Sequence, residues 1–310
     1  MERSVLVPLD GSPFGEQALP AAVSIARRLG ARLDVVEVFI PYDLLQSNMG
    51  WTSVEVLGEI DGILKCRAEN YVKHTVSRLA ADRTVQVEGA VTSGFIVEGI
   101  LRQVERTRPE LIVMTTHGRG PLSRFWLGST ADQVMRHATV PVLLIRPREA
   151  APEPSADPLA GRMLIALDGF PLAEEILGPA ASLGIPGQTH FCLLRVVQPP
   201  SYPFSPLAVE STAPLIEFDS AMACAKAREY LEQIAARLRA KRFEVSSRVV
   251  IDPSPASAII EQSGAQACGA IAITTHARHG LPRLIIGSVA DKVVRGATVP
   301  VLLNRGNGER

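Results

Sequence analysis

Short apolar runs alternate along the chain with stretches in which apolar residues recur at helical spacing. The first run, Val5–Leu9, is rich in β-branched residues and predicts a buried strand. Between Ala18 and Leu29 the apolar positions follow a helical period, and Gly30 is suited to end that helix. Ser12-Pro13 has the residue types of an N-cap and a following first helical residue, so we expect the helix to start there.

The same alternation continues through the rest of the first half. Strands separated by helices imply parallel pairing through right-handed crossovers, so we expect a three-layer α/β sandwich around a parallel sheet. Further strands are expected at Leu33–Phe39, Val85–Val91, Leu111–Thr115 and Val140–Ile145. Further helices are expected in the second part of the segment Pro41–Ala81, at Ile96–Arg106 and at Ser129–His137.

The second half of the chain repeats the first. Asp10-Gly11 returns as Asp168-Gly169, and several such matches follow one another in the same order near one offset. This pattern indicates a duplicated domain rather than a short-period solenoid. The other matched segments are Thr115–His117 with Thr274–His276, Leu127–Asp132 with Ile286–Asp291, and Ala138–Leu144 with Ala297–Leu303.

Prolines concentrate between the two copies and predict an extended connector. We therefore expect a first domain at 1–147, a Pro-rich linker at 148–160 and a second domain at 161–306. Each copy ends in an apolar strand, and an exposed apolar edge invites pairing with another strand. We expect the two edges to pair within one chain as a pseudo-symmetric dimer, and association of whole chains into a homo-oligomer stays open.

Composition and charge limit the classes of function. The chain has 32 Lys and Arg against 32 Asp and Glu, and each half is balanced by itself. Nucleic-acid-binding surfaces usually show a basic excess, so no nucleic-acid partner is expected. The 4 cysteines form no C-x-x-C pair and fit incidental thiols in a reducing cytoplasm. With no signal peptide and no apolar run of membrane-spanning length, a cytoplasmic protein without a membrane partner is expected.

Two loops should lie at the carboxyl ends of parallel strands, where open α/β sheets bind ligands. One begins at Asp10, and the other spans residues 115–130. Gly118 lets backbone N–H groups turn toward an anion, and Gly128 opens a helix whose N-terminus favours negative charge. Arg119 adds positive charge. These features indicate a phosphate cradle, and the alternative is a glycine loop that only turns the chain.

Both copies resemble the universal stress protein family. The nucleotide signature of that family is a glycine, two residues, a glycine, nine residues and a glycine followed by Ser or Thr. Gly118 and Gly128-Ser129 match its last two glycines, whereas Thr115 replaces the first. The resemblance implies two tandem Rossmann-like domains of the adenine nucleotide α-hydrolase type, each with five parallel strands. It also implies ATP, ADP or AMP as ligand, possible Mg²⁺, and contacts at Pro8, Asp10, Val38, Met114, Thr115, His117, Gly118, Arg119, Gly128, Ser129 and Thr130.

The second copy keeps fewer of the implied features. Ala277 stands in place of Gly118, and Phe170 stands in place of the Ser12 cap. If the backbone at residue 277 needs a positive φ, alanine costs about 1 kcal/mol or more. The first site is therefore expected to be the stronger one. The corresponding candidates in the second copy are Asp168, Val196, His276, Gly287, Ser288 and Val289.

Three functions remain open from the sequence. The first is a regulatory protein of the universal stress response that binds ATP, and the others are a slow ATPase and a nucleotide-free scaffold. No P-loop, dinucleotide fingerprint or hydrolase elbow occurs, and no dedicated general base is evident. Catalytic residues, a metal site and a protein partner are therefore not assigned.

Overall fold

The computed structural model describes residues 3–45, 54–81, 83–116, 127–147, 157–199, 219–275 and 287–306. The strands of the first half are β1 (Ser4–Leu9), β2 (Arg32–Phe39), β3 (Val87–Ser93), β4 (Leu111–Thr115) and β5 (Val142–Ile145). Its helices are the 3₁₀ turn η1 (Gly15–Ala18), α1 (Leu19–Leu29), α2 (Tyr42–Leu45), α3 (Val54–Ala80), α4 (Ile96–Thr107) and α5 (Ser129–His137).

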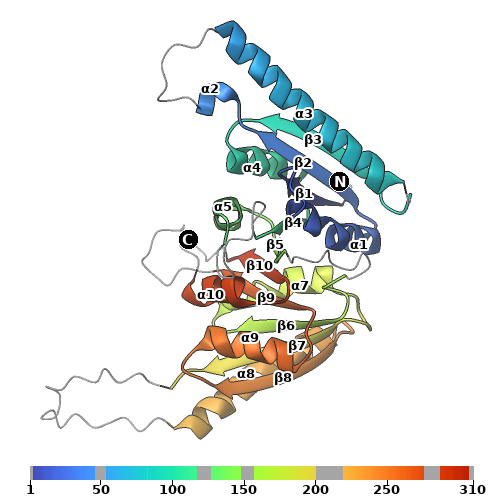
Figure 1. Ribbon diagram of the computed structural model, residues 1–310. Coiled ribbons are helices and arrows are strands. Elements are labelled where there is room, and N and C mark those ends of the chain that lie inside the picture. The colour runs from blue at the N-terminus through green and yellow to red at the C-terminus, as the bar shows by residue number, and fades with distance from the viewer. Residues whose placement is uncertain are drawn as a thin grey trace, which may run out of the picture.

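The second half repeats these elements in the same order. Its strands are β6 (Arg162–Leu167), β7 (His190–Val197), β8 (Glu244–Ile251), β9 (Ala270–Thr275) and β10 (Val301–Arg305). Its helices are α6 (Pro171–Glu174), α7 (Leu177–Leu183), α8 (Ser220–Arg239), α9 (Pro255–Ala265) and α10 (Ser288–Gly296). Figure 1 shows the halves stacked one above the other, with α3 and α8 at opposite ends.

All described strands belong to one sheet of ten strands, in the order β3-β2-β1-β4-β5-β10-β9-β6-β7-β8. Within each half every pairing is parallel, which confirms the predicted five-stranded parallel sheets. The chain changes its direction of winding between β1 and β4, and again between β6 and β9. Such switch points open a crevice at the carboxyl ends of the strands, which is where this class of sheet binds ligands.

The two halves join through an antiparallel pairing of β5 with β10, which we call the seam. Leu143 lies opposite Leu302, and Leu144 lies opposite Val301. These side chains are at most 3% exposed. The pairing of the two apolar edge strands within one chain, predicted from the sequence, is confirmed.

The apolar core continues across the seam on both faces of the sheet. Leu143 and Leu302 belong to the cluster under α1, α7 and α8, whereas Leu144 and Val301 belong to the cluster under α4, α5, α9 and α10. Since side chains alternate between the faces of a strand, each seam strand contributes to both clusters. Fully burying a leucine contributes about 1.5–3 kcal/mol, so the seam is a substantial part of the core.

Polar contacts reinforce the seam. The Arg146 guanidinium, just after β5, donates to the carbonyl oxygens of Arg295 and Ala297, at 3.0 Å for Ala297. These carbonyls end α10, where the helix dipole favours a cation. Burial lowers the pKa of Arg146. Arg28 of α1 also pairs with Asp157 at 2.7 Å, so the segment that enters the second half is tied to the first.

The start of α1 differs from the prediction. A 3₁₀ turn precedes the α-helix, which begins at Leu19 rather than directly after Ser12. Ser12 still acts as a local cap, because its hydroxyl oxygen accepts from the Gly15 backbone N–H at 3.0 Å. Pro20 falls in the first turn of α1, where its missing N–H has no intrahelical partner to lose. The sequence pattern located the cap but not the turn between cap and helix.

Candidate functional site

Three strand ends converge beside the first switch point. Pro8 of β1, Val38 of β2 and Met114 of β4 lie at the carboxyl ends of their strands. Alternation along the strands directs all three side chains to the face that carries α4 and α5, because their neighbours Leu6, Val36 and Ile112 lie in that cluster. These residues, taken from the sequence alone, form a short apolar floor at one crevice.

Asp10 begins the loop that borders this floor. Its Oδ1 accepts from the Ser12 backbone N–H at 3.0 Å and from the Ser12 hydroxyl at 2.6 Å. Gly11 adopts φ +72°, and a Cβ on Gly15 would lie 2.5 Å from Asp10 Oδ1. The loop therefore needs glycine at both positions to hold the carboxylate in this place.

The N-terminus of α5 borders the other side. Gly128 is its N-cap, with extended backbone angles and no side chain to cap the helix. Its N–H donates to the Thr116 carbonyl at 2.7 Å, and the Thr116 N–H donates to the Ile145 carbonyl at 2.9 Å. These bonds fix the helix start to the ends of β4 and β5. Ser129, which is exposed, and Thr130, which is half-buried, are the first two residues of the helix. The first turn of a helix favours a bound anion.

Thr115 stands where the signature of the resembled family has its first glycine. It is the last residue of β4, is paired with Ile145 of β5, and is 8% exposed. A residue in regular strand backbone does not require the freedom of glycine. The threonine therefore causes no backbone strain at this position.

Only part of the predicted phosphate loop lies within the residues that the structure describes. His117, Gly118 and Arg119 lie outside the described residues, and so does His276 in the second copy. The other predicted positions fall on β1, β2, β4 and the start of α5, and their equivalents fall on β7 and the start of α10. Asp10 and Asp168 directly follow β1 and β6. The contacts implied for the loop itself stay a prediction.

Sequence reasoning missed two glycines and a carboxylate near the first crevice. Gly99 lets α4 approach β2, because a Cβ there would lie 2.7 Å from Val38 Cγ1. Gly15 makes room for Asp10, as described above. Glu37 of β2 lies against the other side of the Asp10 loop, 3.8 Å from the position of a Cβ on Gly11. These residues can be recognised only from contacts between segments that are distant in the sequence, because no local motif contains them.

The second crevice has a different charge pattern. Asp168 Oδ1 accepts from the Phe170 backbone N–H at 3.0 Å. Arg195, at the place that Glu37 holds in the first half, lies against this loop, since a Cβ on Gly169 would be 3.2 Å from Arg195 Cζ. Burial lowers the pKa of Arg195, and the charges of Asp168 and Tyr230 oppose that shift. A comparison of the two repeats position by position could have found this exchange of charge.

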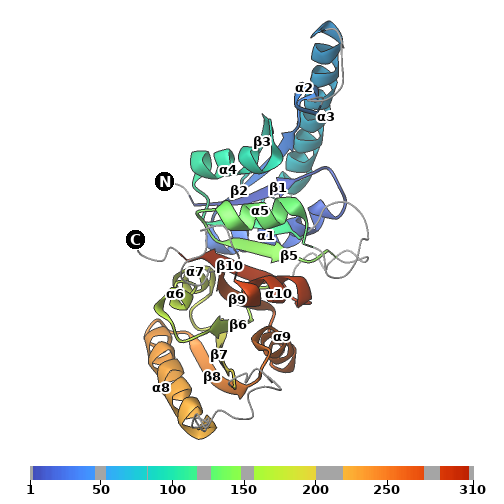
Figure 2. The same ribbon diagram turned by 90° about the vertical axis from the view of Figure 1, so that its left-hand side faces the viewer.

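The start of α10 matches that of α5. Gly287 is its N-cap with extended backbone angles, and Ser288 and Val289 begin the helix. Val196 of β7 and Val38 of β2 are both half-buried against the cluster under α4, α5, α9 and α10. Figure 1 and Figure 2 both place α5 beside β5 and α10 beside β10. The two helix starts therefore flank the seam.

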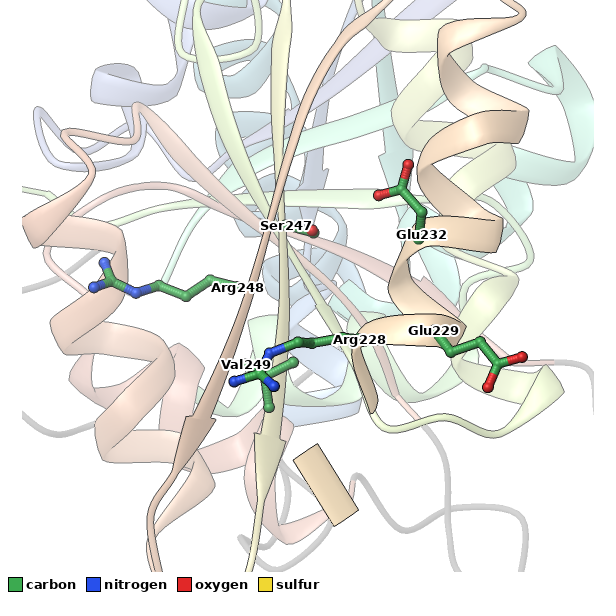
Figure 3. A pocket seen from close by; sticks show the side chains of 6 residues that line it. All are labelled: Arg228, Glu229, Glu232, Ser247, Arg248 and Val249. Atoms are coloured by element: carbon green, nitrogen blue, oxygen red, sulfur yellow. The ribbon is translucent and has the colours of Figure 1, made fainter. Parts of the chain in front are cut away.

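A pocket of about 430 Å³ lies elsewhere, between α8 and β8. Figure 3 shows Ser247 pointing toward α8, whereas Arg248 points away to the other side of the strand. Two arginines and two glutamates line it, so its charges balance and do not favour an anion. Its lining residues are Arg228, Glu229, Glu232, Ser247, Arg248 and Val249.

Among the described residues, no group of three or more His, Cys, Asp or Glu side chains is arranged to hold a metal ion. Among the described helices, none combines the length and the apolar character needed to cross a bilayer.

The strand order defines an open α/β fold with a switch point in each half of the sheet. The model of the universal stress protein family matches residues 1–146 and again residues 160–305. The chain therefore belongs to the universal stress protein family, as a tandem member with two such domains.

Relatives of similar length have the same family name. The universal stress protein Rv2005c of Mycobacterium tuberculosis is 27% identical over 245 residues, which are 76% of this chain and 75% of the relative. The universal stress protein Rv1996 of the same species is 26% identical over 333 residues, covering 97% of this chain and 94% of the relative.

Solved structures agree on the fold of the whole chain. A universal stress protein from Archaeoglobus fulgidus superimposes with a TM-score of 0.69 at 17% identity, covering 97% of this chain and 98% of that one. A second structure, from Pseudomonas aeruginosa, gives 0.63 at 17% identity, covering 99% and 94%. At this identity the likeness establishes the fold.

Proposed function

We propose that the chain is a regulatory protein of the stress response that binds an adenine nucleotide, preferably ATP, in its first half. The observation that carries the proposal is the placement of two segments beside one switch point. The Asp10 loop follows β1, and the start of α5 is hydrogen-bonded to the end of β4, the strand that pairs with β1. Support also comes from membership of the family, whose nucleotide signature Gly118 and Gly128-Ser129 match.

Each part of the site suits one part of the nucleotide. Asp10 offers a carboxylate to the hydroxyl groups of a ribose, since charge-assisted hydrogen bonds are the stronger ones. Val38, Pro8 and Met114 offer apolar surface to the adenine ring. The N–H groups at the start of α5 and the Ser129 hydroxyl suit phosphate oxygens. Mg²⁺, if it accompanies ATP, would be held mainly by the phosphates.

A binding role is favoured over hydrolysis. Asp10 Oδ1 already accepts two hydrogen bonds from Ser12, which suits an oriented acceptor better than a general base. Phosphoryl transfer also needs a group that orients the attacking water. We infer that bound ATP acts in the cytoplasm by changing which partners the protein contacts.

Two measurements test the proposal. The full chain, purified without added nucleotide, is denatured, and the released small molecules are identified by mass spectrometry. Stripped protein is then titrated with ATP by calorimetry, and Glu69→Gln on the exposed face of α3 serves as a control for changes of surface charge. Bound ATP, or saturable ATP binding that Glu69→Gln leaves intact, supports the proposal.

Other results decide between the alternatives. Bound ADP, together with phosphate release from added ATP, favours the slow ATPase. A protein that is empty when purified and does not bind ATP favours the nucleotide-free scaffold and contradicts the proposal.

A further inference from the structure

The strand β8 forms one end of the sheet and has a free outer edge. Within the described residues it pairs with β7 alone. The Asp252 backbone N–H, directly after β8, donates to the Val197 carbonyl of β7 at 3.1 Å. Because successive residues of a strand direct their N–H and C=O groups to opposite sides, Ser247, Val249 and Ile251 direct theirs away from β7. Such a row of unpaired backbone groups can pair with a further strand.

A side chain of α8 covers only the beginning of this edge. The Arg239 guanidinium donates to the Val245 carbonyl at 3.3 Å and also pairs with Glu232. In the described part of the chain, no comparable bond engages the outward backbone groups of Ser247 to Ile251. The open part of the edge therefore extends from residue 247 to residue 251.

The pocket between α8 and β8 lies along this open part of the edge. Val249 packs against α8, and Ser247 points in the same direction (Figure 3). Arg248 points to the opposite face of the strand and still lines the pocket, so the pocket extends around the outer edge of β8. Its volume of about 430 Å³ is within the usual range for ligand pockets. Unpaired backbone groups and space for a ligand therefore occur together.

The charged residues of the pocket differ in their position relative to the edge. Figure 3 shows Arg228 extending toward Val249, whereas Glu229 points away from the strand. Glu232 is held by Arg239, and Arg228 has no ion pair with any described residue. The lining charges balance as a set, so they suit a neutral main chain with one carboxylate beside Arg228 better than a free anion.

The carboxyl end of the edge is apolar. Ile251 is 47% exposed, and alternation along the strand places its side chain on the same face as Val249. Val249 packs against Cys224, so the start of α8 lies over this end of β8. Met222, in the first turn of α8, is 52% exposed. An apolar side chain of a ligand would be shielded from water here.

We propose that this edge binds an extended peptide segment of a partner protein, which joins the sheet as a further strand. Backbone hydrogen bonds to Ser247, Val249 and Ile251 supply the affinity, and alternate side chains supply the specificity. The segment has a carboxylate that pairs with Arg228 and, two residues away, a β-branched apolar side chain beside Ile251. Residues two apart on a strand lie on one face and are separated by about 7 Å, so one segment reaches both places.

A fluorescein-labelled peptide with the sequence Thr-Val-Thr-Glu-Thr-Val-Thr tests the proposal. Its residue pattern is the same in both directions, so it suits parallel and antiparallel pairing. Fluorescence polarisation follows its binding to the full chain, and a peptide with Lys in place of Glu is the control. We expect saturable binding of the Glu peptide, about tenfold tighter than that of the Lys peptide. Hydrogen exchange of the Val249 and Ile251 amides should slow when the Glu peptide binds.

Two pairs of variants locate the bound peptide. Ser247→Pro removes an N–H that points away from β7, so the sheet is kept and peptide binding should be lost. Ser247→Ala keeps this N–H, and the difference between the two variants isolates the backbone donor. Arg228→Glu should reverse the preference and favour the Lys peptide. Lys226→Glu, the same charge change at an exposed position of α8 outside the pocket, should not reverse it.

Three results would overturn the proposal. The first is that neither peptide binds the full chain. The second is that Ser247→Pro binds the Glu peptide as tightly as the unmodified chain does. The third is that Arg228→Glu keeps the preference for the Glu peptide, and this result does not depend on whether the proline variant folds.

Discussion

The two halves of the chain have similar residues at the seam and different residues at the carboxyl-end crevices. At the seam, β5 and β10 contribute equivalent apolar residues, and each leucine meets an equally buried residue of the other strand. At the crevices, Glu37 in one half is replaced by Arg195 in the other, and Ser12 is replaced by Phe170. The region that joins the copies has remained alike, whereas the regions beyond the strand ends have diverged.

The charge difference has a direct physical meaning for ligand binding. In the first half, Asp10 is held by uncharged donors of Ser12. In the second half, the Arg195 guanidinium lies beside the Asp168 loop and attracts its carboxylate. A carboxylate with a cationic neighbour is a weaker acceptor for ribose hydroxyls. We therefore expect the first crevice to be the stronger nucleotide site.

The largest effect is expected at the seam. Leu144→Lys places a charged group where the leucine is 1% exposed, and should lower the free energy of unfolding by about 3–5 kcal/mol. Leu303→Lys should cost a similar amount, because the seam is alike on both sides. Urea unfolding measures both, with Thr139→Lys at an exposed position as the matched control. A Leu144→Lys variant as stable as that control would show that the seam contributes little.

A smaller loss is expected at the polar end of the seam. Arg146→Met removes hydrogen bonds from a charged donor to the last carbonyls of α10 and should lower the free energy of unfolding by about 2–3 kcal/mol. Arg146→Lys keeps the charge but lacks the planar fork, so it should recover only part of the loss. Thermal unfolding of the three proteins measures the difference. Full recovery by lysine would mean that the charge alone matters.

The crevices should respond unequally. Asp10→Ala should weaken ATP binding by about 1–3 kcal/mol, because charge-assisted hydrogen bonds to the nucleotide are lost. Asp168→Ala should leave the tighter binding step unchanged. Calorimetric titration of the full chain with ATP distinguishes the two variants. Equal losses in both would show that the crevices are equivalent despite Arg195.

The smallest effect concerns space rather than charge. Gly15→Ala puts a Cβ 2.5 Å from Asp10 Oδ1, so the carboxylate must shift and ATP affinity should fall by about 1 kcal/mol. The second half already has Ala173 at the equivalent place, and Ala173→Gly should not change the affinity of the first crevice. Titration with ATP compares the two variants. Unchanged affinity in Gly15→Ala would place Asp10 outside the binding site.

The sequence pattern predicted most of the fold because strand and helix periods repeat twice along one chain. Each repeat supports the other, so β4 and α5 were placed with their observed bounds. The predicted start of α1 was wrong, because a 3₁₀ turn and an α-helix show the same apolar spacing over so few residues. Asp10 and Gly128 were proposed as site residues because they lie in the segments that follow the carboxyl ends of β1 and β4.

Other parts of the sites had no local signal. Glu37 and Arg195 lie inside strands whose pattern indicates only core and surface. Such groupings become visible when the repeats are compared residue by residue in the folded chain.

The covalent link between the halves also changes how this molecule can vary. When two separate identical chains pair through their last strands, every substitution appears on both sides of the axis at once. Here β5 and β10 belong to one polypeptide, so a change such as Arg195 for glutamate affects a single side. The tether also keeps the partner strand at a local concentration in the millimolar range, whatever the concentration of the protein. Pairing therefore tolerates mutations that a freely dissociating pair would not survive, and one half is free to acquire a task of its own.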